Sequence, residues 1–192
     1  MAHEVLVYAD WEAFEQPALV GILRQSLIRN NEHFSFRYDD DWLQSDHARS
    51  IDPELALYQG EHHAAAGHNF RTFLDSCPDR WGRVLMQRRE AILARLENRS
   101  RRRLTEMDFL LGVHDSYRMG ALRFKETETG AFLNDLDELT APPITTLREL
   151  EQAAWRVQAP ESDNDPQLTH WLGLLISPGS SLGGARPKAS VV

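Results

Sequence analysis

The chain has 192 residues, of which 42% are hydrophobic and 26% are charged, and this composition favours a globular protein over a disordered one. No stretch approaches the apolar run that spans a bilayer, and the first residues lack the basic and then apolar pattern of a signal peptide. The net charge of -8 argues against a nucleic-acid footprint over the whole surface, and the single cysteine, Cys77, excludes an intramolecular disulfide. We therefore expect a cytoplasmic protein that binds neither a membrane nor DNA directly.

The first part of the chain predicts β-structure. Short apolar runs at residues 5–8 and 19–23 are separated by a polar connection that contains proline. Residues 34–38 then alternate aromatic with polar side chains, which is the period of a half-buried strand. A further short strand is expected around residues 55–58.

Two groups of residues in this part could suggest metal ligands. Three aspartates occupy positions 39–41, but a turn followed by a helix start at Trp42 is the preferred interpretation. His62, His63 and His68 match no standard metal-ligand spacing and lack a partnering cysteine or carboxylate cluster, so we interpret them as incidental residues of a loop. We expect no metal site.

From Phe70 onward the pattern becomes helical. Pro78 and Asp79 stand where a helix would begin, and Thr105 with Asp108 predicts the cap of a second, short helix. The apolar residues of the first helix recur at steps of three and four: Trp81, Val84, Leu85, Ile92, Leu93 and Leu96.

The remaining elements follow in the last third of the chain. Residues 120–124 return to strand character, and a capping-box pattern, Thr146 with Glu149, predicts another helix. The polar segment 159–166 is bounded by proline and is the best candidate for a linker.

One segment is crowded with arginine. The preferred interpretation is a solvated helix face followed by a basic turn, and the alternative is a patch for tRNA or an acidic partner. The arginines are Arg80, Arg83, Arg88, Arg89, Arg95, Arg99, Arg101, Arg102 and Arg103.

The segment 177–188 is rich in glycine and serine. Glycines let a backbone curl closely around phosphate oxygens, hydroxyls add donors, and Arg186 and Lys188 supply positive charge. The segment is not a Walker A loop, because it has no Gly-Lys-[Ser/Thr] triplet, and its glycine spacing is wrong for a dinucleotide fingerprint. On composition alone, a phosphate site and a plain flexible loop are both open.

Four segments, in the right order, resemble HipA-type protein serine/threonine kinases. Residues 77–83, Cys-Pro-Asp-Arg-Trp-Gly-Arg, are similar to the Leu-Pro-Asp-x-Trp-Gly-Arg signature of that family, with cysteine where leucine is frequent. The Gly-rich segment resembles the family's loop, in which a serine precedes x-[Gly/Ala]-Gly-x-x-x-Lys. The four similar segments are residues 34–38 with 42–43, 73–83, 111–115 with 118–124, and 179–189.

The resemblance implies a protein kinase of the toxin type that uses ATP and magnesium, with the Gly-rich loop over the ATP phosphates. Ser181 falls on the position that the family autophosphorylates, and Ser180 is the alternative acceptor. A HipB-like DNA-binding antitoxin and an aminoacyl-tRNA synthetase substrate are the partners implied. The implied nucleotide-binding residues are Gly179, Ser180, Ser181, Leu182, Gly183, Gly184, Ala185, Arg186 and Lys188.

The same resemblance predicts the domain organisation. The fold class is α+β, with an antiparallel sheet and helices that lead into the start of a kinase-like nucleotide lobe. Residues 1–158 would form the HipA-type amino-terminal subdomain, and residues 159–192 a linker, a helix and the Gly-rich loop.

No catalytic residue is assigned within the chain. The strand lysine, the catalytic aspartate and the magnesium ligands of a kinase are expected beyond Val192, so these residues alone should be inactive. Asp108 is interpreted as a helix cap, and Asp115 as part of a turn or an ion pair with Arg118. The main alternative is a stand-alone regulatory or antitoxin-like module without catalysis, and a nucleic-acid-binding module is the weaker one.

Overall fold

The computed structural model describes residues 2–29, 31–65, 67–135 and 147–158. These residues form a five-stranded antiparallel sheet and a set of helices, so the predicted α+β class is confirmed. The elements are β1 (His3–Ala9), β2 (Ala18–Ile28), β3 (Asn31–Tyr38), α1 (Asp40–Gln44), β4 (His62–His63), α2 (Arg71–Asp75), α3 (Arg80–Leu96), α4 (Glu106–Leu111), the 3-10 turn η1 (Asp115–Tyr117), β5 (Leu122–Lys125) and α5 (Leu147–Gln158).

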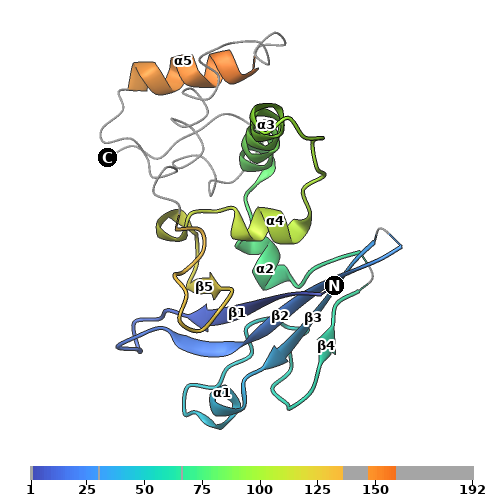
Figure 1. Cartoon of the computed structure of the whole chain (residues 1–192). Coiled ribbons are helices and arrows are strands. Elements are labelled where there is room, and N and C mark those ends of the chain that lie inside the picture. Colours follow the sequence, from blue (N-terminus) through green and yellow to red (C-terminus); the bar gives the residue numbers. More distant parts are fainter. Residues whose placement is uncertain (1, 30, 66, 136–146, 159–192) are drawn as a thin grey trace.

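The strand order across the sheet is β4-β3-β2-β1-β5 (Figure 1). The strands β1, β2 and β3 form a meander, in which Val5 lies opposite Leu23 and Leu23 lies opposite Phe36. The last strand, β5, comes from a distant part of the sequence and pairs antiparallel with β1, with Val7 opposite Phe124. Both outer strands, β4 and β5, are short.

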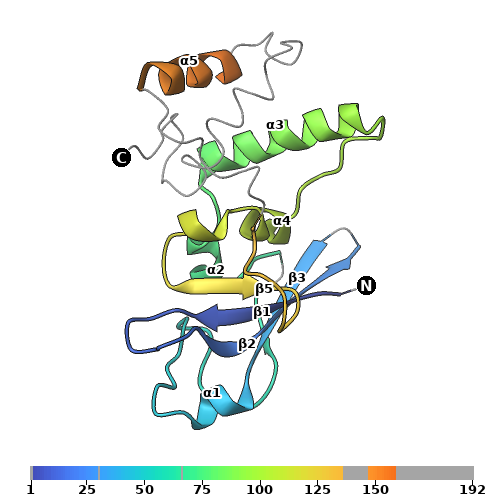
Figure 2. The same cartoon turned by 60° about the vertical axis from the view of Figure 1, so that its left-hand side comes forward.

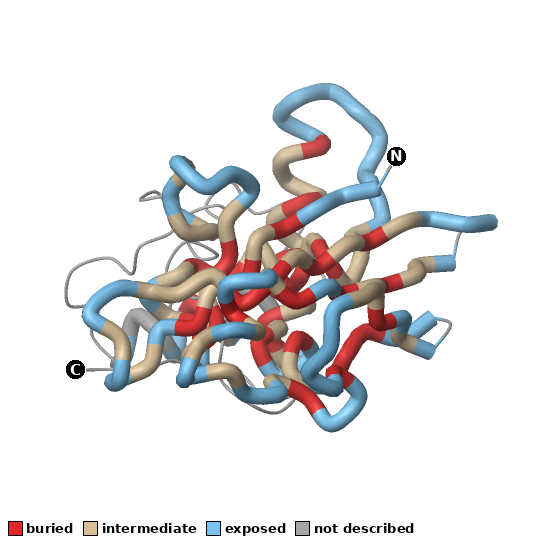
Figure 3. The backbone as a smooth tube through the Cα atoms, turned by 90° about the horizontal axis from the view of Figure 1, so that it is seen from below, coloured by how far each residue is buried: buried red, intermediate tan, exposed pale blue. Residues whose placement is uncertain are grey.

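The core lies between one face of the sheet and the helices above it. In both cartoon views α2 and α4 lie between the sheet and α3 (Figure 1, Figure 2). Alternate residues of the strands are buried, as the period of two predicts, and the buried backbone is concentrated at the centre of the molecule (Figure 3). The ring of Phe73 in α2 lies 5.6 Å from the Phe36 ring and 6.3 Å from the Phe124 ring.

Most elements expected from the sequence are present. The strands at the start of the chain, the helix after Asp79, the capped helix after Thr105 and the strand near residue 124 are all confirmed. Helix α1 begins at Asp40, two residues before the expected start, because Asp39 Oδ1 accepts hydrogen bonds from the backbone N–H groups of Asp41 and Trp42.

The strand expected around residues 55–58 is wrong. The carbonyl oxygen of Leu55 accepts hydrogen bonds from the hydroxyls of Tyr38, at 2.8 Å, and Ser50, at 2.9 Å, so side chains occupy the acceptor that a ladder would use. The fourth strand is instead formed by His62–His63, which pair with Phe36 and Ser35. The expectation of a loop at these two histidines is corrected accordingly.

The centre of the sheet requires glycine at position 21. A Cβ atom there would lie 2.2 Å from the carbonyl oxygen of Arg37 and 2.7 Å from the Phe36 ring. The backbone oxygen belongs to the neighbouring strand and cannot move without breaking the ladder. The register of β1 on β2 also shifts next to this point, between Val7 and Tyr8.

We predict that Gly21→Ala lowers the free energy of unfolding by about 2–3 kcal/mol, because the new methyl group forces β2 and β3 apart. Urea denaturation followed by circular dichroism measures the change. Ser26→Ala, in the same strand and partly exposed, is the control and should change the stability by less than about 0.5 kcal/mol. A Gly21→Ala variant as stable as this control would contradict the steric constraint.

Candidate functional site

All residues predicted to bind nucleotide or to accept phosphate lie outside the described residues. This holds for the loop 179–188, including Ser180 and Ser181, for the whole unit 159–192, and for Thr146 of the last expected cap. Their assignments therefore stay predictions. The structure does describe the other three family-like segments, and it brings them together around α2, α3 and α4.

The signature segment 77–83 forms the junction between α2 and α3. Asp79 caps α3, because its Oδ1 accepts a hydrogen bond of 2.8 Å from the N–H of Gly82, and Trp81 and Gly82 are buried in the first turn. Cys77 packs against the core, and burial raises the pKa of its thiol to about 12. The thiol therefore stays protonated near neutral pH and is a packing group, not a nucleophile.

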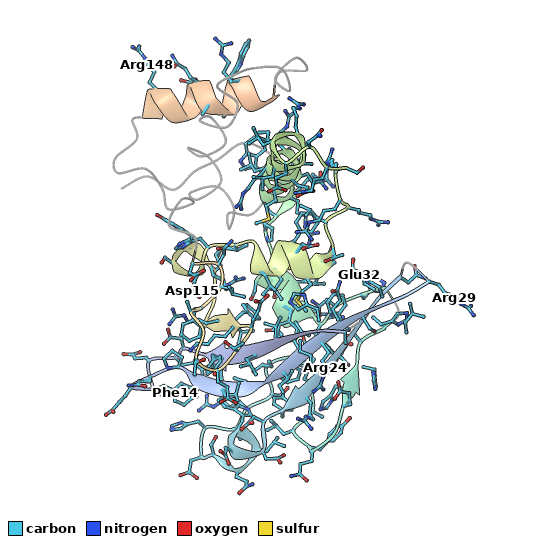
Figure 4. The ribbon with its side chains drawn as sticks, viewed as in Figure 1. Phe14, Arg24, Arg29, Glu32, Asp115 and Arg148 are labelled. Atoms are coloured by element: carbon cyan, nitrogen blue, oxygen red, sulfur yellow. The ribbon has the colours of Figure 1, made fainter. Side chains whose placement is uncertain are left out.

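Arg83, the last residue of the signature, joins α3 to α4. Its two terminal nitrogens each donate to one carboxylate oxygen of Glu106 at 2.6 Å, its Nε donates to the carbonyl of Pro78, and its guanidinium lies 4.5 Å from the centre of the Phe109 ring. The N–H of Glu106 in turn donates to the carboxylate of Glu32, which extends from the β2–β3 hairpin (Figure 4). The signature segment, helix α4 and the sheet are thus linked through hydrogen bonds to charged groups.

Arg118 is buried at the centre of the third family-like segment. Its Nη1 donates to the carbonyl oxygens of Ser76, at 3.2 Å, and Leu110, at 2.8 Å. Its Nη2 donates to the carbonyl oxygens of Val113, at 2.9 Å, and Leu133, at 3.0 Å. One guanidinium therefore satisfies carbonyls from the end of α2, from α4 and its following turn, and from the segment after β5.

The environment of Arg118 is unusual for a cation. The guanidinium carbon lies 4.6 Å from the centre of the Phe124 ring, and burial lowers the pKa of the side chain to about 10. Among the described residues no carboxylate forms an ion pair with it, so the expected ion pair between Asp115 and Arg118 is wrong. The carboxylate of Asp115 contributes only a more distant attraction.

Asp115 instead pairs with Arg123. It opens the 3-10 turn, as expected (Figure 4), and its carboxylate accepts hydrogen bonds from Nε and Nη2 of Arg123. Arg123 also donates to Asp10 at 3.1 Å, and its guanidinium lies 3.7 Å from the centre of the Phe132 ring. These contacts attach the β5 edge strand to the turn before it and to the end of β1.

The arginine-rich segment is partly neutralised by its own acidic neighbours. Glu90 is the centre of this arrangement: its side chain is only 6% exposed, and it accepts hydrogen bonds from the guanidinium of Arg99, at 2.6 Å, and from the backbone N–H of Arg102. Arg99 also pairs with Glu97, and Arg102 with Asp108. These pairs agree with the interpretation of a solvated helix face and a basic turn.

Two of the residues weighed as metal ligands have structural roles: Asp39 caps α1, and His62 packs its ring 4.3 Å from the Tyr58 ring. Asp108, interpreted as a helix cap, forms the predicted capping box with Thr105. Within the described residues, no group of three or more His, Cys, Asp or Glu side chains is placed to hold a metal ion. No helix in this described part of the chain is long and apolar enough to cross a membrane.

Comparison with models of protein families identifies the family to which these segments belong. Residues 16–125 match the family model described as the HipA N-terminal domain. The chain belongs to this family. The match covers more than half of the sequence and includes β2 to β5, with the signature junction, the Arg83–Glu106 pair and Arg118. A comparison with curated proteins found no match.

We predict that Arg118→Lys lowers the free energy of unfolding of this HipA N-terminal domain by about 2–4 kcal/mol. An ammonium has three donors on one nitrogen and cannot reach four carbonyls on opposite sides of the side chain. Urea denaturation measures the loss, and Arg37→Lys, at an exposed position of β3, is the matched control. A loss no larger than that of the control would show that the carbonyls do not depend on the guanidinium.

A second prediction concerns Glu90. Hydrogen bonds from Arg99 lower the pKa of its carboxyl from 4.5 to about 2, so ionised Glu90 stabilises the folded state above pH 4.5, and this contribution is lost as the pH falls towards 2. Glu90→Gln should therefore be less stable than the parent chain at pH 7, and the difference should shrink between pH 4.5 and 2. Urea titrations across this range are the measurement.

Glu97→Gln is the control for Glu90, because Glu97 contacts the same Arg99 but its side chain is 55% exposed. Its effect should be small at every pH. A Glu90→Gln difference that does not change with pH would contradict the assigned role of the carboxylate.

Proposed function

We propose that this chain is the amino-terminal portion of a HipA-like protein serine/threonine kinase of the toxin type. The match of residues 16–125 to the HipA N-terminal domain is the observation that carries the proposal. Support also comes from the Gly-rich segment after it, whose sequence resembles the phosphate loop of HipA-type kinases. The proposed reaction is transfer of the γ-phosphoryl group of ATP to a hydroxyl of a target protein.

The proposed role of segment 179–188 is to hold the phosphates of ATP. Backbone N–H groups of a glycine-rich turn donate to phosphate oxygens, and Arg186 and Lys188 balance their charge. Magnesium would neutralise the charge that develops on the transferred group. The catalytic aspartate, the strand lysine and the magnesium ligands are assigned to the remainder of such a kinase.

We assign Ser181 as the residue whose phosphorylation regulates the kinase, with Ser180 as the alternative. A phosphate adds a charge of about -1.5 to -2 at neutral pH. Beside the ATP phosphates this charge is repulsive, and Arg186 can hold the modified loop in an open position. Autophosphorylation would then lower the affinity for ATP and stop the reaction.

The same proposal covers the partners. The partner assigned to a toxin of this family is a HipB-like DNA-binding antitoxin, so contact with DNA would be made by the antitoxin and not by this chain. An aminoacyl-tRNA synthetase is the proposed class of target. Both interactions would take place in the cytoplasm.

One observation favours a second candidate, a stand-alone regulatory or antitoxin-like module. The matched residues end at position 125, before the Gly-rich segment, so the match itself covers the amino-terminal domain and no part of a kinase lobe. The coding sequence after Val192 separates the two candidates. An open frame with a strand lysine and a later Asp-Asn pair supports the kinase, and a stop codon supports the module.

We predict that Ser181→Ala in the full-length kinase keeps the affinity for ATP high and removes self-inactivation, whereas Ser180→Ala has less effect. Calorimetry of nucleotide binding to phosphorylated and unphosphorylated protein is the measurement. Equal affinities of the two forms would contradict the mechanism, and phosphate found only on Ser180 would contradict the residue assignment. The 192 residues alone should not transfer phosphate, and labelling of Ser181 by this fragment would contradict that expectation.

A further inference from the structure

The connection between α3 and α4, residues 97–105, is held against the domain by two of its arginines. In both cartoon views it runs down one side of the molecule from the end of α3 to the start of α4 (Figure 1, Figure 2). The two terminal nitrogens of Arg99 donate to the carboxylate of Glu90 at 2.6 and 3.1 Å, and a terminal nitrogen of Arg102 lies 2.9 Å from the carboxylate of Asp108. Both guanidinium groups are therefore neutralised by acidic side chains of α3 and α4.

The other two arginines of the connection are free. Arg101 and Arg103 are exposed, and neither forms a hydrogen bond or an ion pair with any described residue. They alternate with Arg102 and with Leu104, which packs against the small apolar cluster formed by α3, α4 and the turn after α4. Residues 99–105 contain no helix or turn. The alternation is therefore that of an extended chain, and Arg101 and Arg103 extend from the same, outward side.

The backbone of the connection is fixed at both ends and in the middle. At its start, Asn98 adopts a left-handed conformation with a φ of 50°, and the N–H of Arg99 donates to a carbonyl of α3 at 2.9 Å. In the middle, the N–H of Arg102 donates to the carboxylate of Glu90 at 3.0 Å. At the end, Thr105 forms the capping box of α4. The two free arginines thus project from an ordered segment, so a ligand does not have to order the chain that carries them.

The spacing of the two free guanidinium groups suits a pair of carboxylates. Residues two positions apart in an extended chain are separated by about 7 Å along the backbone, and a partner chain that is also extended repeats its side chains at the same interval. Each guanidinium presents its donors in a planar fork that matches the two oxygens of one carboxylate. Two acidic residues at alternate positions of an extended segment therefore match both arginines at once.

We propose that Arg101 and Arg103 form a binding surface for an extended acidic segment of a partner protein, with glutamate or aspartate at alternate positions. Each guanidinium binds one carboxylate of the segment. The other two arginines of the connection are already neutralised, so the surface offers two positive charges at a fixed spacing. The inference rests on this surface and is independent of kinase activity.

Nucleic acid fits this surface less well, although it is also an anion. The cavity beside the connection is lined by Arg102 and by four acidic residues, Glu90, Asp108, Glu126 and Asp135. A nucleic acid has a charge at every nucleotide, so a strand that continues past the two free arginines meets these carboxylates. The net charge of -8 adds to the repulsion. A short acidic segment has its charges only at the two matched positions.

The test is a titration of the 192-residue chain, with nitrogen-15 in its arginine side chains, with the peptide acetyl-Ala-Glu-Ala-Glu-Ala-amide at low salt. We expect saturable shifts of the Nε–H signals of Arg101 and Arg103, with a dissociation constant on the order of 1 mM. The corresponding glutamine peptide should bind at least about fivefold more weakly, because it lacks the charge. Salt at about 1 M, where the Debye length is about 3 Å, should abolish the binding.

Variants locate the surface. The double variant Arg101→Gln, Arg103→Gln should weaken binding of the glutamate peptide by at least about fivefold. The double variant Arg49→Gln, Arg71→Gln removes the same charge from two exposed positions elsewhere, and should change the affinity by less than about twofold. Equal effects of the two double variants, equal binding of the glutamate and glutamine peptides, or no saturable shift would overturn the proposal.

Two further ligands test the nature of the partner. The peptide acetyl-Ala-Glu-Glu-Ala-Ala-amide has the same charge, but its adjacent side chains point to opposite sides of an extended chain, so it should bind about threefold more weakly. Equal affinity for the two glutamate peptides would overturn the extended pairing. Single-stranded hexauridylate RNA should bind more weakly than the alternating peptide. Tighter binding of this RNA, lost in the Arg101→Gln, Arg103→Gln variant, would overturn the assignment to a protein partner.

Discussion

The buried guanidinium of Arg118 is the interaction on which the arrangement of the helices depends. A helix end and the turn that follows it leave carbonyl groups without partners, and burying several of them together would normally be unfavourable. Here one side chain provides donors to four such carbonyls, from Ser76 to Leu133, while its flat face rests on Phe124. The end of α2, α4 and the segment after β5 can therefore meet in the interior with these carbonyl groups hydrogen-bonded.

Hydrogen bonds of charged side chains also connect the elements that lie away from the centre of the molecule. Arg83 and Glu106 join α3 to α4 with a two-point contact, and Glu32 supplies an acceptor to the start of α4 from the sheet. Each contact uses a helix end or a planar ion pair, where a fixed geometry matters more than apolar area. The residues of the family signature thus have a structural role: they begin α3 and fix its orientation relative to α4, independently of any catalytic step.

The sequence was most informative where one local rule decided the structure. Alternating aromatics predicted β3, and Asp79 and Thr105 predicted helix starts, because capping and side-chain alternation depend on residues only a few positions apart. The partners of Arg118 and Arg123 could not be predicted, since they join segments distant in sequence and no short pattern distinguishes a carbonyl partner from a carboxylate. The strand at His62 was missed for a different reason: a strand of two residues is too short to show an alternation of buried and exposed side chains.

The pairing of β1 with β5 has a consequence for how the chain reaches its fold. Residues such as Leu6 are made first, yet their partners near Lys125 emerge last within the matched region. Until then β1 presents an open edge that can pair with other chains, and the loop that must close is long. During synthesis on the ribosome, the strands β1 to β3 are therefore complete before β5 is available to pair with β1. A pause or a break in translation before residue 122 would leave an intermediate with an unpaired strand edge that is prone to aggregation.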